Sequence, residues 1–136
     1  MKTFQLTILT PYGLYLDAQA NYVQVTSEDY TLGILPGHSP LISTLVISTM
    51  YIKFDNEKIP YAIGGGIIRV EKDKVTLLLD SVERYDEIDY NRALSAKERA
   101  EKRLKEKEED SSIDEHRAEY ALARALNRIK VITSKN

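Results

Sequence analysis

The sequence predicts an α+β protein in two parts: an N-terminal antiparallel β-sandwich of short strands, then a C-terminal antiparallel hairpin of two helices. In the first part apolar residues recur every second position, as in 4–8, which is the period of a half-buried strand. In the second part they recur every three or four positions, as in 93–104, which is the period of a helix. A sandwich, residues 1–85, therefore precedes a hairpin, residues 86–136.

Turn-forming residues divide the β half into short segments. Pro11 and Gly13 end the first strand, and the prolines and glycine within 36–40 cannot continue a ladder. The glycines at 64–66 indicate a β-bulge or a tight strand junction, because no Lys-Ser or Lys-Thr pair follows them as a phosphate-binding loop requires. The strands expected from this division are 3–9, 22–26, 31–35, 41–48, 50–54, 59–63, 67–71 and 75–79.

The α half predicts two helices whose seam consists largely of alanine. Asp89 can cap the first helix by accepting hydrogen bonds from N–H groups of its first turn, and Ser112 or Asp114 can cap the second. The seam positions are Ala93, Ala96, Ala100 and Leu104 on the first helix and Ala118, Leu122, Ala125, Ile129 and Ile132 on the second. Such a seam buries little area, so the hairpin depends on docking against the sandwich or a partner. An element held so weakly can adopt more than one position.

Composition restricts the classes of function. The formal net charge of −2 and the isoelectric point of about 5.7 provide no basic field for a nucleic-acid partner. The absence of cysteine excludes thiolate metal sites and fits a reducing cytoplasm. No apolar run approaches the roughly 18 residues of a membrane-spanning helix, so we expect no direct membrane insertion. His38 and His116 have no catalytic motif around them, and we expect neither an enzyme nor a metal site.

Four arginines give the clearest indication of a binding site. Arg92 and Arg99 share a face of the first helix, and Arg124 and Arg128 share a face of the second. In an antiparallel hairpin the start of one helix lies beside the end of the other, so all four converge toward its open end. Arg99, Arg124 and Arg128 have no acidic residue three or four positions away. The four form either a solvated row of charges or a polyanion site that binds phosphates with the positive end of the first helix.

Several motifs resemble the epsilon subunit of bacterial F-type ATP synthases. The resemblance covers essentially the whole chain, and the most specific of its motifs is LGILPGHSPL at 32–41. The other motifs stand in the family's order along the chain: TPYG at 10–13, DSVER at 80–84, ERAE at 98–101 and RALNR at 124–128. The family's fold, an N-terminal β-sandwich of about ten short strands followed by a C-terminal helical hairpin, agrees with the two parts that periodicity predicts.

The resemblance implies a non-catalytic rotor subunit of the central stalk. Its sandwich would bind the gamma subunit and the membrane c-ring at the cytoplasmic face of the cell membrane, and would help couple proton translocation to ATP synthesis. Its hairpin would alternate between a folded state and an extended state that reaches the catalytic alpha/beta hexamer and inhibits ATP hydrolysis. The alternative is a free-standing adaptor whose charged hairpin binds another protein. A small nucleotide hydrolase is disfavoured because no base or metal site is present.

The resemblance also implies that the folded hairpin binds ATP as a regulatory ligand, with no other cofactor. The family has an Ile/Leu-Asp-x-x-Arg-Ala motif at the start of its first helix, where this chain has IDYNRA. The implied site consists of Glu83, Ile88, Asp89, Arg92, Ala93, Arg99, Arg124 and Arg128. Glu83 and Asp89 would accept hydrogen bonds from adenine or ribose, and the arginines would bind the phosphates. Ile88 and Ala93 would pack against the base. Alternatively, Asp89 is only a helix cap with Arg92 as its salt-bridge partner.

Overall fold

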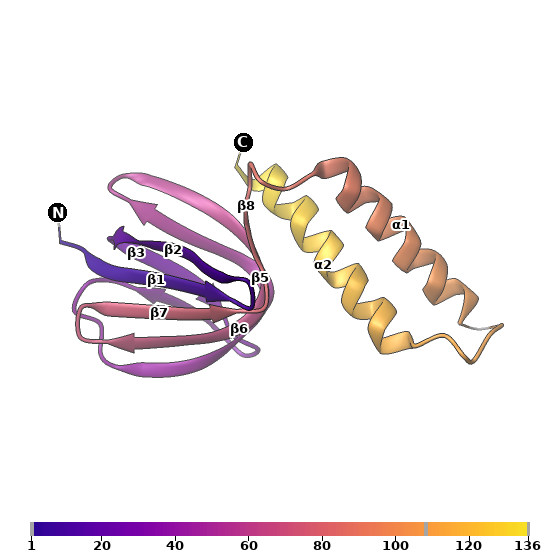
Figure 1. The fold of residues 1–136 in the computed structure, drawn as a ribbon, viewed down its shortest axis with the longest axis horizontal. Coiled ribbons are helices and arrows are strands. Elements are labelled where there is room, and N and C mark those ends of the chain that lie inside the picture. Colours follow the sequence, from indigo (N-terminus) through magenta and orange to yellow (C-terminus); the bar gives the residue numbers. More distant parts are fainter. Residues whose placement is uncertain (1, 108, 136) are drawn as a thin grey trace.

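The computed structural model describes residues 2–107 and 109–135. Residues 1, 108 and 136 lie outside the described residues. The β part forms one end of an elongated molecule and the helical hairpin forms the other (Figure 1). In the described ranges the β part has strands β1 (Phe4–Thr10), β2 (Gly13–Ala20), β3 (Tyr22–Thr26), β4 (Thr31–Ile34), β5 (Leu41–Phe54), β6 (Glu57–Glu71), β7 (Lys74–Leu79) and β8 (Val82–Arg84).

The predicted fold class is confirmed, but the strands are divided differently. β5 and β6 each continue without a break where the sequence predicts two short strands, and β2 and β8 lie outside the predicted set. The described residues therefore contain eight strands, fewer than the approximately ten of the expected fold. β2 lies outside the predicted set because it is an edge strand with weak burial; its Leu14 is 62% exposed. The sheet is antiparallel except that β1 and β7 pair in parallel, which corrects the expectation of a purely antiparallel sandwich.

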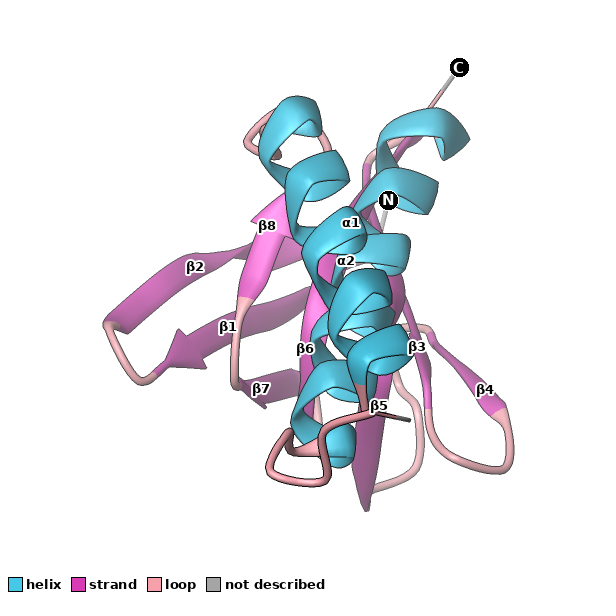
Figure 2. Ribbon diagram, turned by 90° about the vertical axis from the view of Figure 1, so that its right-hand side faces the viewer, coloured by secondary structure: helices cyan, strands magenta, loops and turns pink. Residues whose placement is uncertain are grey.

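The strand order explains how one continuous sheet forms two layers. The order is β2-β1-β7-β6-β5-β3-β4, with β8 also paired to β6. Viewed from the hairpin, β1, β2 and β7 lie on one side and β3 and β4 on the other, with β5 and β6 between them (Figure 2). The two long strands are therefore shared by both layers. The alternation expected in β1, β3 and β7 is confirmed, because Leu6, Ile8, Val23, Val25 and Leu77 are fully buried.

The glycines of β6 allow β7 and β8 to follow it closely. Gly66 has φ +151°, and a Cβ at this position would lie 2.0 Å from the carbonyl oxygen of Leu78. After β7 the chain stays beside β6, where the N–H of Gly64 donates to the carbonyl of Ser81 at 3.0 Å. It then forms β8, which also pairs with β6. The strand junction expected at 64–66 is wrong, because β6 continues through these glycines. The close approach that they permit lets β8 pair with β6, and Glu83 of β8 faces the hairpin, where it contacts Arg128.

The hairpin consists of α1 (Tyr90–Glu106) and α2 (Glu115–Ser134). Both expected caps are present: Asp89 Oδ1 accepts the N–H of Arg92 and Asp114 Oδ1 accepts the N–H of Arg117, each at 3.1 Å. Neither helix, within the described ranges, is long and apolar enough to cross a membrane.

α2 packs on two sides, and it lies between α1 and the sandwich (Figure 1). The seam with α1 is as thin as predicted, with Ala93, Ala100, Ala118 and Ala125 buried and Leu122, Ile129 and Ile132 half-buried. The sequence does not place Val131 in this seam, yet Val131 is fully buried. It lies one helical turn from Asn127, on the side of α2 that contacts the sandwich.

Candidate functional site

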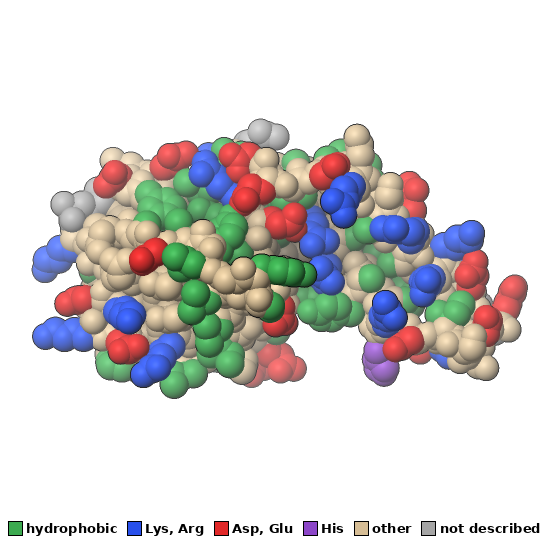
Figure 3. Space-filling view, in the orientation of Figure 1, with side chains coloured by type: hydrophobic (Ala, Val, Ile, Leu, Met, Phe, Trp, Pro, Cys, Tyr) green, Lys and Arg blue, Asp and Glu red, His purple; other side chains and the backbone are tan. Residues whose placement is uncertain are grey.

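A cavity of about 250 Å³ opens where the helices meet the end of the sandwich. Its walls come from β8, from the hinge (residues 85–89) that joins β8 to α1, and from both helices. In Figure 3 basic side chains gather beside acidic ones at this junction. All of the predicted site residues except Ile88 and Arg124 line the cavity, whose lining consists of Glu83, Glu87, Asp89, Arg92, Ala93, Ala96, Arg99 and Arg128.

Arg124 lies in a small neighbouring void. This void, about 10 Å³, shares Glu83 and Arg128 with the larger cavity, so the four arginines converge as the helical spacing predicts. The Arg124 guanidinium lies 5.7 Å from the centre of the Tyr120 ring, a cation–π contact. Ile88 is half-buried in the hinge and lines neither space.

Arg128 has a partner that its own helix does not provide. Its Nε lies 2.5 Å from Glu83 Oε1, so an ion pair joins α2 to β8. The sequence correctly indicates that Arg128 has no acidic neighbour in its own helix, but helical spacing cannot show a carboxylate contributed by a strand. Both side chains are partly exposed, 26% and 33%, so we expect the pair to contribute only about 0.2–1 kcal/mol to docking.

The guanidinium groups of Arg92 and Arg99 make no hydrogen bond or ion pair with the part of the chain that the structure describes. Asp89 caps the backbone N–H of Arg92 but forms no side-chain pair with it in these residues. The simple-cap alternative is therefore confirmed for the cap and wrong for the salt bridge. α1 presents two uncompensated cations to the cavity, an arrangement suited to an anion with several charged oxygens.

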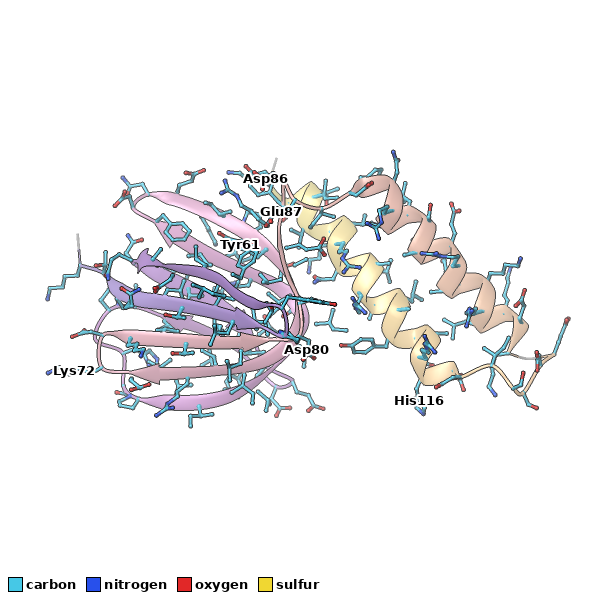
Figure 4. The ribbon with its side chains drawn as sticks, in the orientation of Figure 1. Tyr61, Lys72, Asp80, Asp86, Glu87 and His116 are labelled. Atoms are coloured by element: carbon cyan, nitrogen blue, oxygen red, sulfur yellow. The ribbon has the colours of Figure 1, made fainter. Side chains whose placement is uncertain are left out.

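Glu87 is a cavity residue that sequence reasoning missed. Its Oε1 accepts the Tyr15 hydroxyl and, at 2.8 Å, the N–H of Arg84. Figure 4 places Glu87 beside the C-terminal end of α2, at the opposite end of the hairpin from His116. The contact joins positions 72 residues apart, so no local pattern could indicate it. Burial, with the Glu87 hydrogen bond, raises the pKa of Tyr15 well above its usual range, and burial raises the pKa of the neighbouring Tyr61 to about 12.

The hairpin docks on the sandwich chiefly through polar groups of α2. Asn127 donates from Nδ2 to the carbonyl of Ser48 at 2.8 Å, and its Oδ1 accepts the Thr49 hydroxyl at 3.3 Å. The Tyr120 hydroxyl donates to the carbonyl of Gly64 at 3.2 Å. These groups are hydrogen-bonded to water when the helix detaches, so the net stabilisation from docking is modest.

Comparisons with known proteins agree over the whole molecule. Two family models match: "ATP synthase, Delta/Epsilon chain, beta-sandwich domain" over residues 3–85, and "ATP synthase, Delta/Epsilon chain, long alpha-helix domain" over residues 86–133. The ATP synthase epsilon chain of Bacillus licheniformis is 44% identical over 131 residues, covering 96% of this chain and 98% of that protein. The epsilon chain of Bacillus cytotoxicus is 43% identical over 135 residues, covering 99% of this chain and 100% of that protein.

A solved structure shares the fold. It belongs to the Euglena gracilis mitochondrial ATP synthase, determined as the OSCP/F1/c-ring assembly, and has a TM-score of 0.78 at 20% identity, covering 98% of this chain and 81% of that one. With both family models matched in sequence order and curated bacterial epsilon chains similar from end to end, this chain belongs to the ATP synthase epsilon chain family of non-catalytic central-stalk subunits.

Proposed function

We propose that the chain is the rotating epsilon subunit of an F-type ATP synthase and that ATP regulates its hairpin. In this proposal the sandwich binds the gamma subunit and the c-ring at the cytoplasmic face of the cell membrane, as a peripheral component, and helps couple proton translocation to ATP synthesis. The hairpin, when released, extends toward the alpha/beta hexamer and inhibits ATP hydrolysis. Family membership supports the general assignment.

An apolar area on the outside of the sandwich supports the subunit contacts. Ile67 of β6 pairs with Leu78 of β7, and their side chains are 41% and 50% exposed. Ile42 of β5, two residues from the strand partner of Ile67, is 73% exposed. Adjacent exposed aliphatic residues on a sheet face are typical of a protein–protein contact. This surface is open while the hairpin is docked elsewhere.

The weak docking of the hairpin supports a switch between two states. α2 is held by a few hydrogen bonds and one partly exposed ion pair, and α1 packs on α2 through alanines. The free-energy difference between docked and released states is therefore small enough for a ligand to reverse it.

The observation that carries the ATP proposal is the cavity in which Arg92 and Arg99 of α1 face Arg128 of α2 and Glu83 of the sandwich. A polyphosphate bound there contacts all three parts at once, so it binds the docked hairpin and not the released one. Such a ligand stabilises the docked state by RT ln(1 + [ATP]/Kd). A high ATP concentration would keep the hairpin docked and leave ATP hydrolysis uninhibited, whereas at a low ATP concentration the hairpin would be released.

Calorimetric titration of the full chain with ATP tests the site. We expect binding by the wild type, and Arg92→Ala and Arg99→Ala should each weaken it about tenfold or more, because each removes an uncompensated cation from the phosphates. Lys130→Ala is the matched control, since Lys130 is an exposed cation of α2 that does not line the cavity. No heat with millimolar ATP, or unchanged affinity in both arginine variants, would overturn the proposal.

A further inference from the structure

Glu87 lines the cavity, but the proposed function gives its carboxylate no role. We propose that Glu87 is the specificity-determining residue of the site, accepting a hydrogen bond from the exocyclic amino group of a 6-aminopurine, and that Tyr15 is its positioning residue. This inference rests on the proposed nucleotide site, and it assigns to Glu87 the selection between purine bases. It concerns the base only, because the arginines that face phosphates do not distinguish one base from another.

The Glu87 carboxylate is held by the sandwich and not by the helices. One donor is the hydroxyl of Tyr15 on β2, and the other is the N–H of Arg84 on β8, at 2.8 Å. Both bonds end on Oε1, and Oε2 accepts no hydrogen bond from the described residues. Burial and the bond to Glu87 raise the pKa of Tyr15, so the phenol remains a donor throughout the physiological range. The carboxylate is thus fixed in orientation with one oxygen available.

The other two carboxylates of the cavity are engaged in structural contacts. Glu83 is paired with Arg128, and Asp89 caps α1 by accepting the N–H of Arg92 at 3.1 Å. Each of these contacts uses one carboxylate oxygen and involves a residue of a helix, so the position of each carboxylate is tied to that helix. Glu87 lines the same cavity, and no Lys or Arg side chain of the described residues forms an ion pair with it. Among the three, and within the described residues, only Glu87 accepts its hydrogen bonds entirely from the sandwich, so its orientation depends on neither helix.

A fixed carboxylate distinguishes the two common purines by chemistry. An ionised carboxylate only accepts hydrogen bonds. Adenine presents an amino donor at the position where guanine presents a carbonyl oxygen, which the carboxylate repels. Because a site that hydrogen-bonds a particular substrate group rejects an analogue that cannot pair with it, we expect clear preference for ATP over GTP. Replacing the carboxylate by an amide, which can donate as well as accept, should remove that preference.

The test is the ratio of dissociation constants for ATP and GTP, measured calorimetrically on the full chain. We expect the wild type to bind ATP about tenfold or more tightly than GTP, and Glu87→Gln to reduce the ratio to about threefold or less. Tyr15→Phe keeps the carboxylate but removes the donor that orients it, so it should lower the ratio to an intermediate value. Glu28→Gln, at an exposed acid outside the cavity, is the control and should leave the ratio unchanged.

The outcomes separate this inference from the proposed function. Absence of ATP binding by the wild type would overturn both. ATP binding with equal GTP binding, or a ratio that Glu87→Gln leaves intact, would overturn the role of Glu87 alone. A merely structural role would lower both affinities together and leave the ratio unaltered, which also counts against it. If Glu87→Gln does not fold, as judged by circular dichroism, the ratio in Tyr15→Phe decides: an unchanged value there overturns the positioning and the specificity that depends on it.

Discussion

Charged side chains in the cavity differ in the partners they already have. Arg128 is held by Glu83, whereas Arg92 and Arg99 have no side-chain partner within the described ranges. A phosphate therefore meets two free cations from α1 and one cation from α2 that it shares with a carboxylate. The contribution of Arg128 to binding consequently depends on Glu83, since removing the arginine leaves an unpaired negative charge beside the phosphates.

A double-mutant cycle between Glu83 and Arg128 measures this dependence. We expect Arg128→Ala to weaken ATP binding about tenfold or more, or at least about 1.4 kcal/mol. The variant carrying both Glu83→Gln and Arg128→Ala should bind about threefold or more tightly than Arg128→Ala alone, because the repulsive carboxylate is gone. Calorimetry on the four proteins gives the coupling. Effects that simply add would show that the two residues act independently.

The two perturbed tyrosines predict how stability responds to alkali. Burial raises the pKa of Tyr15, with a further contribution from Glu87, and raises that of Tyr61 to about 12 in the folded protein. In the unfolded chain tyrosine ionises near pH 10, so the unfolded state loses protons first. The stabilisation is complete below about pH 10 and is lost as the pH rises toward the folded values.

Denaturant unfolding at about pH 9 and about pH 11 should therefore show a lower free energy of unfolding at the higher pH. Tyr61→Phe should make the decrease smaller, because one of the raised pKa values is removed. Absorbance titration of the tyrosines supplies an independent reading: ionisation of all of them near pH 10 in the folded protein would contradict the prediction.

At the scale of elements, α2 is the part that joins the hairpin to the sandwich. One side carries the alanines that face α1, and the other carries Tyr120, Asn127 and Val131. Asn127 uses both its amide nitrogen and its amide oxygen in contacts with β5. A helix interface with so few contacts can separate without unfolding either side.

Asn127→Ala is expected to destabilise docking by about 1–3 kcal/mol, since two hydrogen bonds to the sandwich are lost. Because the chain has no cysteine, spin labels can be placed through Lys72→Cys on the sandwich and His116→Cys on the hairpin, neither of which forms a docking contact (Figure 4). Without nucleotide, the distance distribution should broaden in Asn127→Ala. Leu126→Ala, at a neighbouring position that is 46% exposed, is the control. An unchanged distribution in Asn127→Ala would show that other contacts hold the hairpin.

At the scale of the whole molecule, the main hydrophobic core belongs to the sandwich. Its buried members extend from Phe4 to Val82, and within the described residues the helices contribute none of them. Among its described residues, the hairpin buries only the alanines of its seam and Val131. The sandwich is therefore expected to fold alone and the hairpin is not.

A chain that ends at Asp86 tests this division. We expect it to fold cooperatively and to assemble with the other subunits, but not to bind ATP, because the arginines of the cavity are absent. ATP hydrolysis by the assembled complex should remain level or rise. Circular dichroism, co-purification and hydrolysis assays give the three readings. Failure to assemble would contradict the independence of the sandwich, and a fall in hydrolysis would contradict the inhibitory role of the hairpin.

Periodicity and capping residues determined the fold class and both helix starts, because these features depend on neighbours a few positions apart, as Asp89 and Asp114 illustrate. The IDYNRA motif and the helical spacing likewise led to most of the cavity's residues. Only the tertiary structure decided the partners of those residues. Arg128 meets Glu83 from 45 positions away, and Glu87 meets Tyr15 from 72. The parallel pairing of β1 with β7 is equally non-local. Contacts over such separations follow from how complete layers pack against one another, and no local repeat in the sequence encodes them.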